Sequence, residues 1–178
     1  MELNPEKTDL NVLIAEYVDD LQLFSRKHRL VLDAGNIQAV FIDRDRIGQV
    51  LTNLILNAMK YSPDGGDIKI ISENTSDGRV QVGVMDLGIG VAEELQDRIF
   101  ERFFRIRDGD TKNSAGIGLR LYIANAIIRR HGGEIGVKNN EGKGSVFYFI
   151  LPSLETTIVP LSNSSDDDLG ATPEQQRA

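Results

Sequence analysis

The sequence predicts an α+β fold: a two-layer sandwich with one mostly antiparallel, mixed sheet and helices on one face. Amphipathic helical patterns alternate along the chain with short runs of period-two hydrophobicity. Two pairs of these runs are joined by the turn-like sequences TSDG and EGKG, which are typical of β-hairpins. Hairpins that are preceded and followed by helices indicate one layer of sheet covered by one layer of helices.

The first half of the predicted fold begins with a helix over 9–28, because apolar residues recur there at spacings of three and four. The residues on this stripe are Leu10, Leu13, Ile14, Tyr17, Leu21 and Phe24. Two short strands, 29–35 and 38–44, are expected to follow, joined by a turn. A second amphipathic helix is expected over 45–61, with Asp43 or Asp45 as its N-cap.

The second half alternates in the same way. The patterns predict strands over 67–74 and 79–86, a short helix over 92–100, a polar glycine-containing stretch over 105–116, a helix over 117–130 and strands over 134–140 and 144–152. The last helix is expected to stop at His131, which two glycines follow. Both histidines, His28 and His131, are interpreted as helix-end or surface residues, since cations suit helix C-termini.

Composition narrows the possible functions. The 178 residues include no cysteine and two histidines, which excludes thiol catalysis, disulfides, cysteine-based zinc sites and a multi-histidine metal site. No apolar run approaches the roughly 20 residues of a membrane span, and no signal peptide is recognised. The net charge of −7 argues against nucleic acid as a partner. Residues 1–152 are expected to form one domain and residues 153–178 an acidic, polar, disordered tail.

One flank of the second helix carries a polar patch. Asn53, Asn57 and Lys60 fall within about 60° of one another around the helix axis. An Asn oxygen is a hard ligand for Mg²⁺, and a Lys can contact a phosphate as a point charge. The patch therefore indicates a site for a bound anion and its metal, although a plain polar helix flank is the alternative.

Three further segments are interpreted either as ligand-binding elements or as ordinary structural features. MDLGIG, 85–90, ends a strand with an acid and glycines that allow close approach of a ligand, or forms a simple turn. SAGIGLRL, 114–121, places Gly116 and Gly118 before a helix whose free N–H groups suit a phosphate, or marks a helix start. RIFERFFRIRD, 98–108, is an aromatic cluster with arginines that anchors either the core or a mobile stretch over 105–116.

These four segments, in this order and at these distances, resemble the ATP-binding catalytic domain of two-component sensor histidine kinases, in the superfamily shared with type II topoisomerases and MutL-type ATPases. The resemblance runs from about residue 8 to Pro152. It implies a Bergerat-type sandwich that binds ATP and Mg²⁺. Two positions depart from the family pattern: Arg120 replaces the third glycine of the glycine-rich box, and Ala115 precedes Gly116.

The resemblance also implies roles for individual residues. Asn57 is similar to the Mg²⁺ ligand, with Asn53 beside it, Lys60 near the phosphates and Tyr61 lining the pocket. Asp86 is similar to the acid that reads the adenine amino group. The other implied contacts are Gly88 and Gly90 beside the base, Arg105, Gly116, Gly118 and Leu119 around the phosphates, and Ser145 near the adenine through water.

Reaction type follows from one comparison within the superfamily. Members that hydrolyse ATP usually carry a Glu one helical turn before the Mg²⁺ ligand, where this chain has Asn53. A carboxamide cannot act as a general base, so we expect transfer of the γ-phosphoryl group, with Lys60 and Arg105 as catalytic groups, and little hydrolysis.

The resemblance implies partners outside this chain. Family kinases carry the phosphoacceptor His on a dimerising helical hairpin that nothing here matches, and a response regulator acts downstream. We therefore expect a monomeric, cytoplasmic catalytic domain of an ATP-dependent protein histidine kinase, whose parent protein is either soluble or membrane-anchored. A regulatory nucleotide-binding module without transfer activity, favoured by Arg120, and an anti-sigma-type serine kinase are the alternatives.

Overall fold

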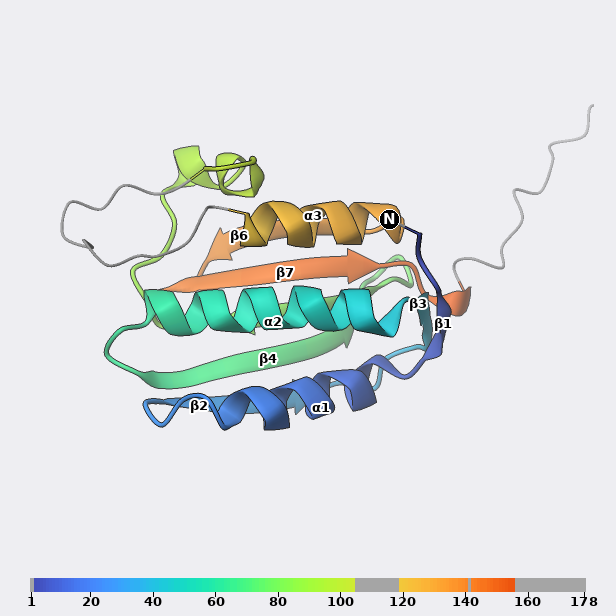
Figure 1. Ribbon diagram of the computed structural model, residues 1–178, viewed down its shortest axis with the longest axis horizontal. Helices are drawn as coiled ribbons and strands as arrows, with labels where there is room; N and C mark the ends of the chain where they lie inside the picture. Colours follow the sequence, from blue (N-terminus) through green and yellow to red (C-terminus); the bar gives the residue numbers. More distant parts are fainter. Residues whose placement is uncertain (1, 105–118, 141, 156–178) are drawn as a thin grey trace, which may run out of the picture.

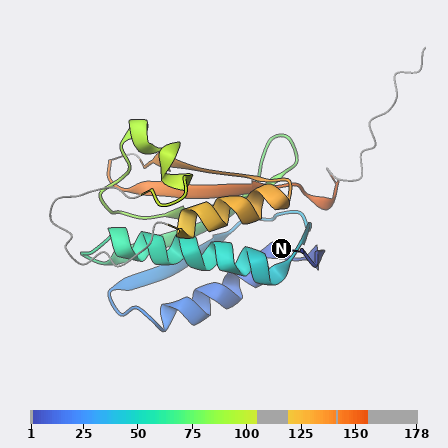
Figure 2. The ribbon, with the colours of Figure 1, turned by 45° about the horizontal axis from the view of Figure 1, so that its top comes forward.

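The computed structural model describes residues 2–104, 119–140 and 142–155, and these residues form the two predicted layers (Figure 1). Three helices lie over one face of a five-stranded sheet, as the view in Figure 2 also shows. The helices are α1 (Leu10–Gln22), α2 (Arg44–Tyr61) and α3 (Arg120–Arg130). In place of the short helix predicted over 92–100 there are two 3₁₀ turns, η1 (Glu93–Leu95) and η2 (Arg98–Phe100).

The main sheet has the strand order β2-β4-β5-β7-β6. Its strands are β2 (His28–Ala34), β4 (Gly66–Asn74), β5 (Val80–Met85), β6 (Glu134–Asn139) and β7 (Ser145–Leu151). β2 runs parallel to β4, and the other neighbours are antiparallel, so the sheet is mixed. The predicted α+β class is therefore confirmed.

The two short strands predicted after α1 are present as β2 and β3 (Val40–Ile42), but they do not pair with each other. β2 pairs with β4, whereas β3 pairs with β1 (Glu6–Thr8) in a separate two-stranded sheet. β1 was not predicted, because three residues with the sequence EKT are too few and too polar to show a period-two pattern.

Aspartates begin the first two helices. The Asp9 carboxylate accepts hydrogen bonds from the backbone N–H groups of Asn11 and Val12, at 3.0 and 3.4 Å. Asp43, one of the two predicted candidates, caps α2 by accepting from the N–H of Arg46 at 3.1 Å. Each such cap satisfies N–H groups that have no partner within the helix.

Two predictions about the end of α1 are wrong. α1 stops at Gln22, and the N–H of Phe24 bonds to the carbonyl of Leu21 at 3.1 Å in a tighter turn. Phe24 therefore leaves the apolar stripe and is 80% exposed. His28, predicted as a helix-end or surface residue, is instead buried as the first residue of β2, because the chain has already left the helix. Its Nε2–H donates to the carbonyl of Ser62 at 2.8 Å.

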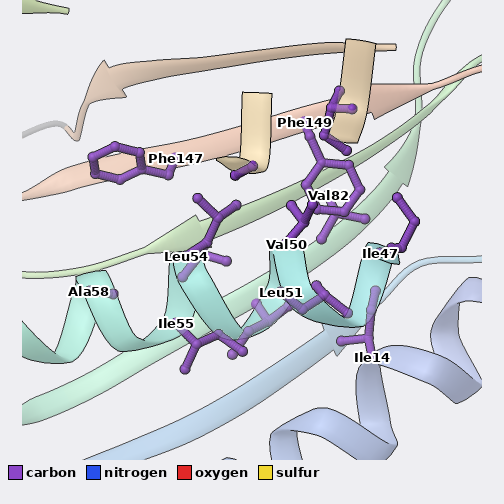
Figure 3. Packing of buried hydrophobic residues seen from close by; sticks show 14 of the residues in the cluster. Ile14, Ile47, Val50, Leu51, Leu54, Ile55, Ala58, Val82, Phe147 and Phe149 are labelled. Atoms are coloured by element: carbon purple, nitrogen blue, oxygen red, sulfur yellow. The ribbon is translucent and has the colours of Figure 1, made fainter. Parts of the chain in front are cut away.

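The core holds α2 in a fixed orientation on the sheet. The predicted stripe is buried in full: Ile47, Val50, Leu51, Leu54 and Ala58. Figure 3 shows these side chains between α1 and the sheet residues Val82, Phe147 and Phe149. Burial of one large aliphatic side chain is worth about 1.5–3 kcal/mol, so the apolar side of α2 determines where its polar flank lies.

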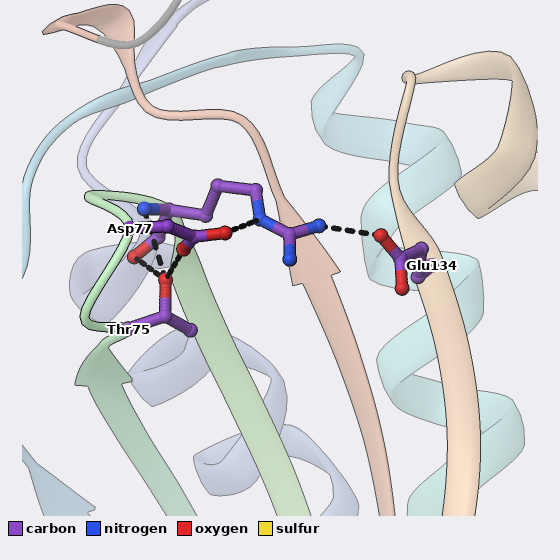
Figure 4. A network of polar contacts seen from close by, with 4 residues as sticks. Thr75, Asp77 and Glu134 are labelled. Atoms are coloured by element: carbon purple, nitrogen blue, oxygen red, sulfur yellow. Dashed lines mark hydrogen bonds and ion pairs between the residues drawn. The ribbon is translucent and has the colours of Figure 1, made fainter.

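An ion-pair network connects segments at the end of the sheet where β5 and β6 begin (Figure 4). The Arg79 guanidinium donates to Asp77 at 2.8 Å and to Glu134 of β6 at 2.5 Å. Thr75 donates its hydroxyl hydrogen to Asp77 in the same turn. The β4–β5 turn is thus joined to a strand two positions away in the sheet. Among the described residues, no helix is long and apolar enough to cross a bilayer.

Candidate functional site

The predicted site residues that the structure describes lie where α2 and β5 end and where β7 and α3 begin (Figure 1). At its centre lie Asp86 and Ser145, each 2% exposed. The backbone N–H of Asp86 donates to the carbonyl of Ser145 at 2.9 Å, and the N–H of Ser145 donates to Oδ1 of Asp86 at 3.3 Å. The N–H of Gly88 donates to the same Oδ1 at 2.8 Å.

No opposite charge on a described residue pairs with the Asp86 carboxyl. Burial raises its pKa above the ordinary value, and the hydrogen bonds from Gly88 and Ser145 oppose this rise. Among the described residues, both hydrogen bonds that the carboxyl accepts end on Oδ1. Oδ2 is therefore the oxygen that remains for a ligand with N–H donors.

Close backbone contacts require glycine at two positions beside Asp86. A Cβ on Gly88 would lie 2.1 Å from the carbonyl oxygen of Tyr61, the last residue of α2. Gly144 has φ +88°, and a Cβ there would lie 2.0 Å from the carbonyl oxygen of Asp86. The glycine after strand β5 therefore does more than form a turn, because it brings the ends of α2 and β5 into contact.

Asn57 lies buried on the flank of α2, with 8% of its surface exposed. Within the described part of the chain its carboxamide forms no hydrogen bond to another residue and is not among the fully enclosed groups that lack a partner, so it remains accessible to a ligand. Asn53 lies one turn earlier and is half-buried, and Lys60 lies near the end of the helix and is exposed. The Lys60 ammonium is 5.1 Å from the centre of the Tyr61 ring.

Helix α3 begins beside this flank. Leu119 is its N-cap residue, and the Leu119 carbonyl accepts the N–H of Ile123 at 2.8 Å. Asn53 Nδ2 donates to the carbonyl of Arg120, the first helical residue, at 3.2 Å. The structure thus brings Asn53, Asn57, Lys60 and Leu119 to the same end of the molecule. Arg105, Gly116 and Gly118, with the predicted mobile stretch 105–116, lie outside the described residues.

The aromatic cluster is divided between core and surface. Phe100 in η2 is 9% exposed, whereas Phe103 is 55% exposed and has φ +65°. The guanidinium of Arg98 lies 5.0 Å from the centre of the Phe104 ring, which packs against the core. Phe100 and Phe104 therefore pack with the core, as the core interpretation predicted, whereas the Phe103 ring lies at the surface.

The donor set fits a metal that is shared with a ligand. Within the ranges described, no group of three or more His, Asp and Glu side chains could hold a metal ion. The buried carboxamide of Asn57 offers one oxygen ligand, and Mg²⁺ usually keeps several waters and binds substrate phosphates besides one or two protein oxygens. Asn57 therefore fits Mg²⁺ that arrives with a nucleotide.

Two residues of this region were not predicted as part of the site. Gly144 was interpreted as part of a hairpin turn, and its contact with Asp86 shows why the turn needs a glycine. Asn139 Oδ1 accepts the N–H of Val91 at 3.0 Å and joins the loop after Gly90 to β6. Gly90 has φ +78°, which favours glycine. The repeated glycines of EGKG were a usable signal, whereas Asn139 gave none.

Fold and site together define a nucleotide-binding domain of the kind found in sensor kinases. Residues 42–155 match the family model described as histidine kinase-, DNA gyrase B-, and HSP90-like ATPase. The chain belongs to this family, and its relatives and structural neighbours are histidine kinases. The family suggested by the sequence motifs is therefore confirmed.

Individual relatives and neighbours agree with this assignment. The adaptive-response sensory kinase SasA of Crocosphaera subtropica is 41% identical over 140 residues, 78% of this chain and 36% of that protein. The catalytic domain of histidine kinase ThkA superposes with a TM-score of 0.72 at 35% identity, covering 86% of this chain and 97% of the other.

Two solved complexes are similar as well. ThkA bound to the response regulator TrrA has a TM-score of 0.71 at 34% identity, covering 85% of this chain and 42% of that chain. Full-length ShkA bound to AMPPNP has a TM-score of 0.72 at 26% identity, covering 85% and 32%. The chain thus spans about a third of the length of SasA and of full-length ShkA.

Proposed function

We propose that this chain binds Mg-ATP and donates the γ-phosphoryl group to a phosphoacceptor His on a helical hairpin that is not part of the sequence. The observation that carries the proposal is Asp86: a buried carboxyl with one oxygen fixed by two backbone N–H groups and the other available to a ligand. A buried acid of this kind is costly unless a ligand hydrogen bond uses it.

In this proposal Asp86 recognises the adenine. Its Oδ2 accepts a hydrogen bond from the exocyclic amino group, while Gly88 and Gly90 leave space for the plane of the base. Tyr61 lines the pocket, and Ser145 contacts the adenine through water. The exchange of hydrogen bonds between Asp86 and Ser145 fixes the two strand ends that form this part of the site.

The phosphates are assigned to the flank of α2 and the start of α3. Asn57 holds Mg²⁺, which supplies charge neutralisation to the triphosphate, and Lys60 supplies a positive charge beside it. The first-turn N–H groups of α3, which follow the N-cap Leu119, face the phosphates, because a helix N-terminus favours anions. Arg105, Gly116 and Gly118 complete the phosphate contacts in the proposal.

The carboxamide at position 53 favours transfer of the γ-phosphoryl group over hydrolysis of ATP. A general base must accept a proton, and the carboxamide of Asn53 has no useful basicity. The γ-phosphoryl group therefore moves from the β-phosphate oxygen of ATP to an imidazole nitrogen of the acceptor, and ADP leaves. Positioning and charge neutralisation supply most of the catalysis in phosphoryl transfer. Lys60 and Arg105 are the proposed catalytic groups.

The neighbours' complexes guide the choice of ligand and partners. ShkA was solved with AMPPNP, and ThkA with a response regulator. By analogy, this chain takes ATP and acts upstream of a response regulator in the cytoplasm, as a monomer when separated from its hairpin. The Arg120 side chain is exposed at the start of α3, where it adds a positive charge near the phosphates.

The test is phosphotransfer in trans. The chain is incubated with γ-labelled ATP, Mg²⁺ and a dimerising hairpin taken from a related sensor kinase, and acid-labile label on the hairpin is measured. We expect label only when the acceptor His is present. Nucleotide binding without transfer to any of several related hairpins would support the regulatory module. Acid-stable label on a serine would support the serine kinase.

A further inference from the structure

Asn53 forms a contact that the family comparison does not explain. Its Nδ2 lies 3.2 Å from the carbonyl oxygen of Arg120, across 67 positions of the chain. We propose that Asn53 is a positioning residue: its carboxamide fixes the first turn of α3 against α2, so that the N–H groups of α3 lie opposite Asn57. The contact itself is independent of the proposed function, and only its effect on nucleotide affinity rests on that function.

The start of α3 has no local side chain that fixes its position, so a contact from α2 can contribute to it. Leu119 occupies the N-cap position, and within the described residues no side chain caps the helix there. The first turn also has no acidic residue that would interact with the helix dipole. The capping positions of α1 and α2 hold Asp9 and Asp43, so α3 differs from both. The hydrogen bond from Asn53 therefore takes part in locating a helix end that lacks a local cap.

The chemistry of the contact is specific to a carboxamide. The Arg120 carbonyl accepts hydrogen bonds and has two lone pairs, one of which remains for Asn53 after the helical N–H is bound. A carboxylate at position 53 would place an oxygen about 3.2 Å from the Arg120 oxygen, and two acceptors repel each other. Asn53 thus has two consequences: it removes a general base, and its Nδ2–H donates to a first-turn carbonyl of α3.

The experiment compares Asn53→Asp with Asn53→Ala in the full chain, without nucleotide. Amide hydrogen exchange is measured at Ile123, whose N–H bonds to Leu119, and at the following Ala124. Exchange is expected to be faster in the Ala variant than in the native chain, and about tenfold faster in the Asp variant, because Asp adds a repulsion to the lost hydrogen bond. Exchange at Val82 and Val84 in the core reports whether each variant remains folded.

Asn74→Asp is the matched control. The Asn74 carboxamide also donates to a backbone carbonyl, that of Asn36 at 2.9 Å, but at the opposite end of the sheet. This variant makes the same chemical change and should leave the exchange of Ile123 and Ala124 unaltered. Equal exchange in Asn53→Asp and Asn74→Asp at these two amides would overturn the proposal.

The order of MgATP affinities of the two Asn53 variants distinguishes a positioning role from direct metal binding. If Asn53 were itself a Mg²⁺ ligand, a carboxylate would serve as well or better, and Ala would reduce MgATP affinity the most. The positioning role predicts the reverse order: in calorimetric titrations, Asn53→Asp should bind MgATP several-fold more weakly than Asn53→Ala. Weaker MgATP binding by Asn53→Ala than by Asn53→Asp would overturn the proposal. Failure of the native chain to bind ATP would contradict the proposed function and leave the exchange result as the measure of the contact.

Discussion

The backbone N–H of Asp43 donates a hydrogen bond to Nε2 of His131 at 3.1 Å, which joins the first turn of α2 to the last turn of α3. On the other side of the ring, Nδ1–H donates to the carbonyl of Ile127 at 2.8 Å. The Asp43 carboxylate meanwhile accepts the N–H groups of Asn4 and Arg46. This junction fixes α2 and α3 at the end away from the site, so it contributes to the orientation of both helices.

We expect Asp43→Ala to lower the free energy of unfolding by about 1–2 kcal/mol at neutral pH, because α2 loses its cap. Hydrogen bonds from Asn4 and Arg46 lower the pKa of Asp43 below its ordinary 3.8. The stabilisation is therefore complete above pH 3.8 and is lost as the pH falls through the lowered value. Urea unfolding at pH 7, 5 and 3 measures it. Asp45→Ala, which alters the first turn without removing the cap, is the control, and equal losses in the two variants would contradict the capping role.

Asp86→Asn should separate binding from stability. Loss of the charged acceptor is expected to weaken ATP binding about 10- to 100-fold, the usual range for a hydrogen bond to a charged group. Burial raises the pKa of Asp86, so the native chain loses stability as the pH rises through the ordinary value towards the raised one. The variant lacks this loss, and its melting temperature at pH 7 should equal or exceed that of the native chain. A strongly destabilised variant with native ATP affinity would show that Asp86 is structural.

Gly88→Ala tests the close approach of α2 and β5. The new Cβ would lie 2.1 Å from the Tyr61 carbonyl oxygen, so the backbone must move, at a cost of about 1–3 kcal/mol. We expect a lower melting temperature and weaker ATP binding together. Gly83→Ala is the matched control, since its nearest neighbour is a methyl group of Val146 at 3.3 Å. If Gly83→Ala and Gly88→Ala behaved alike, the contact with Tyr61 would have no special role.

Asn57→Ala should remove the effect of Mg²⁺ on ATP affinity. The fold should be unaffected or a few tenths of a kcal/mol more stable, since Ala is a better helix former than Asn and Asn57 bonds to no other described residue. Titrations with ATP in the presence of Mg²⁺ or of a chelator measure the difference. A drop of several degrees in melting temperature with the Mg²⁺ effect retained would place Asn57 among the structural residues.

Local patterns predicted those parts of the molecule that depend on neighbouring residues. The apolar stripe of α2 and the hairpins of β4–β5 and β6–β7 follow from periodicity and turn residues, and the structure confirms them. The sequence also singled out Asp86 and Gly88, because an acid and glycines at a strand end are a local signal, and their role in nucleotide binding stays a prediction.

Long-range pairings were not predictable in the same way. β3 pairs with β1, more than 30 residues earlier, and three-residue strands carry too little pattern to show it. The burial of His28 depends on the Ser62 carbonyl, which a distant helix end supplies. The contacts of Gly144 with Asp86 and of Asn53 with Arg120 also join distant segments, so only the folded chain shows what these residues do.

Calorimetric titration of the chain with a non-hydrolysable ATP analogue, with and without Mg²⁺, decides whether the chain forms a nucleotide site. We expect saturable binding with one site per chain, strengthened by Mg²⁺. An absence of binding at millimolar nucleotide, in either condition, would contradict this expectation and would mean that Asp86 and Asn57 do not form a nucleotide site.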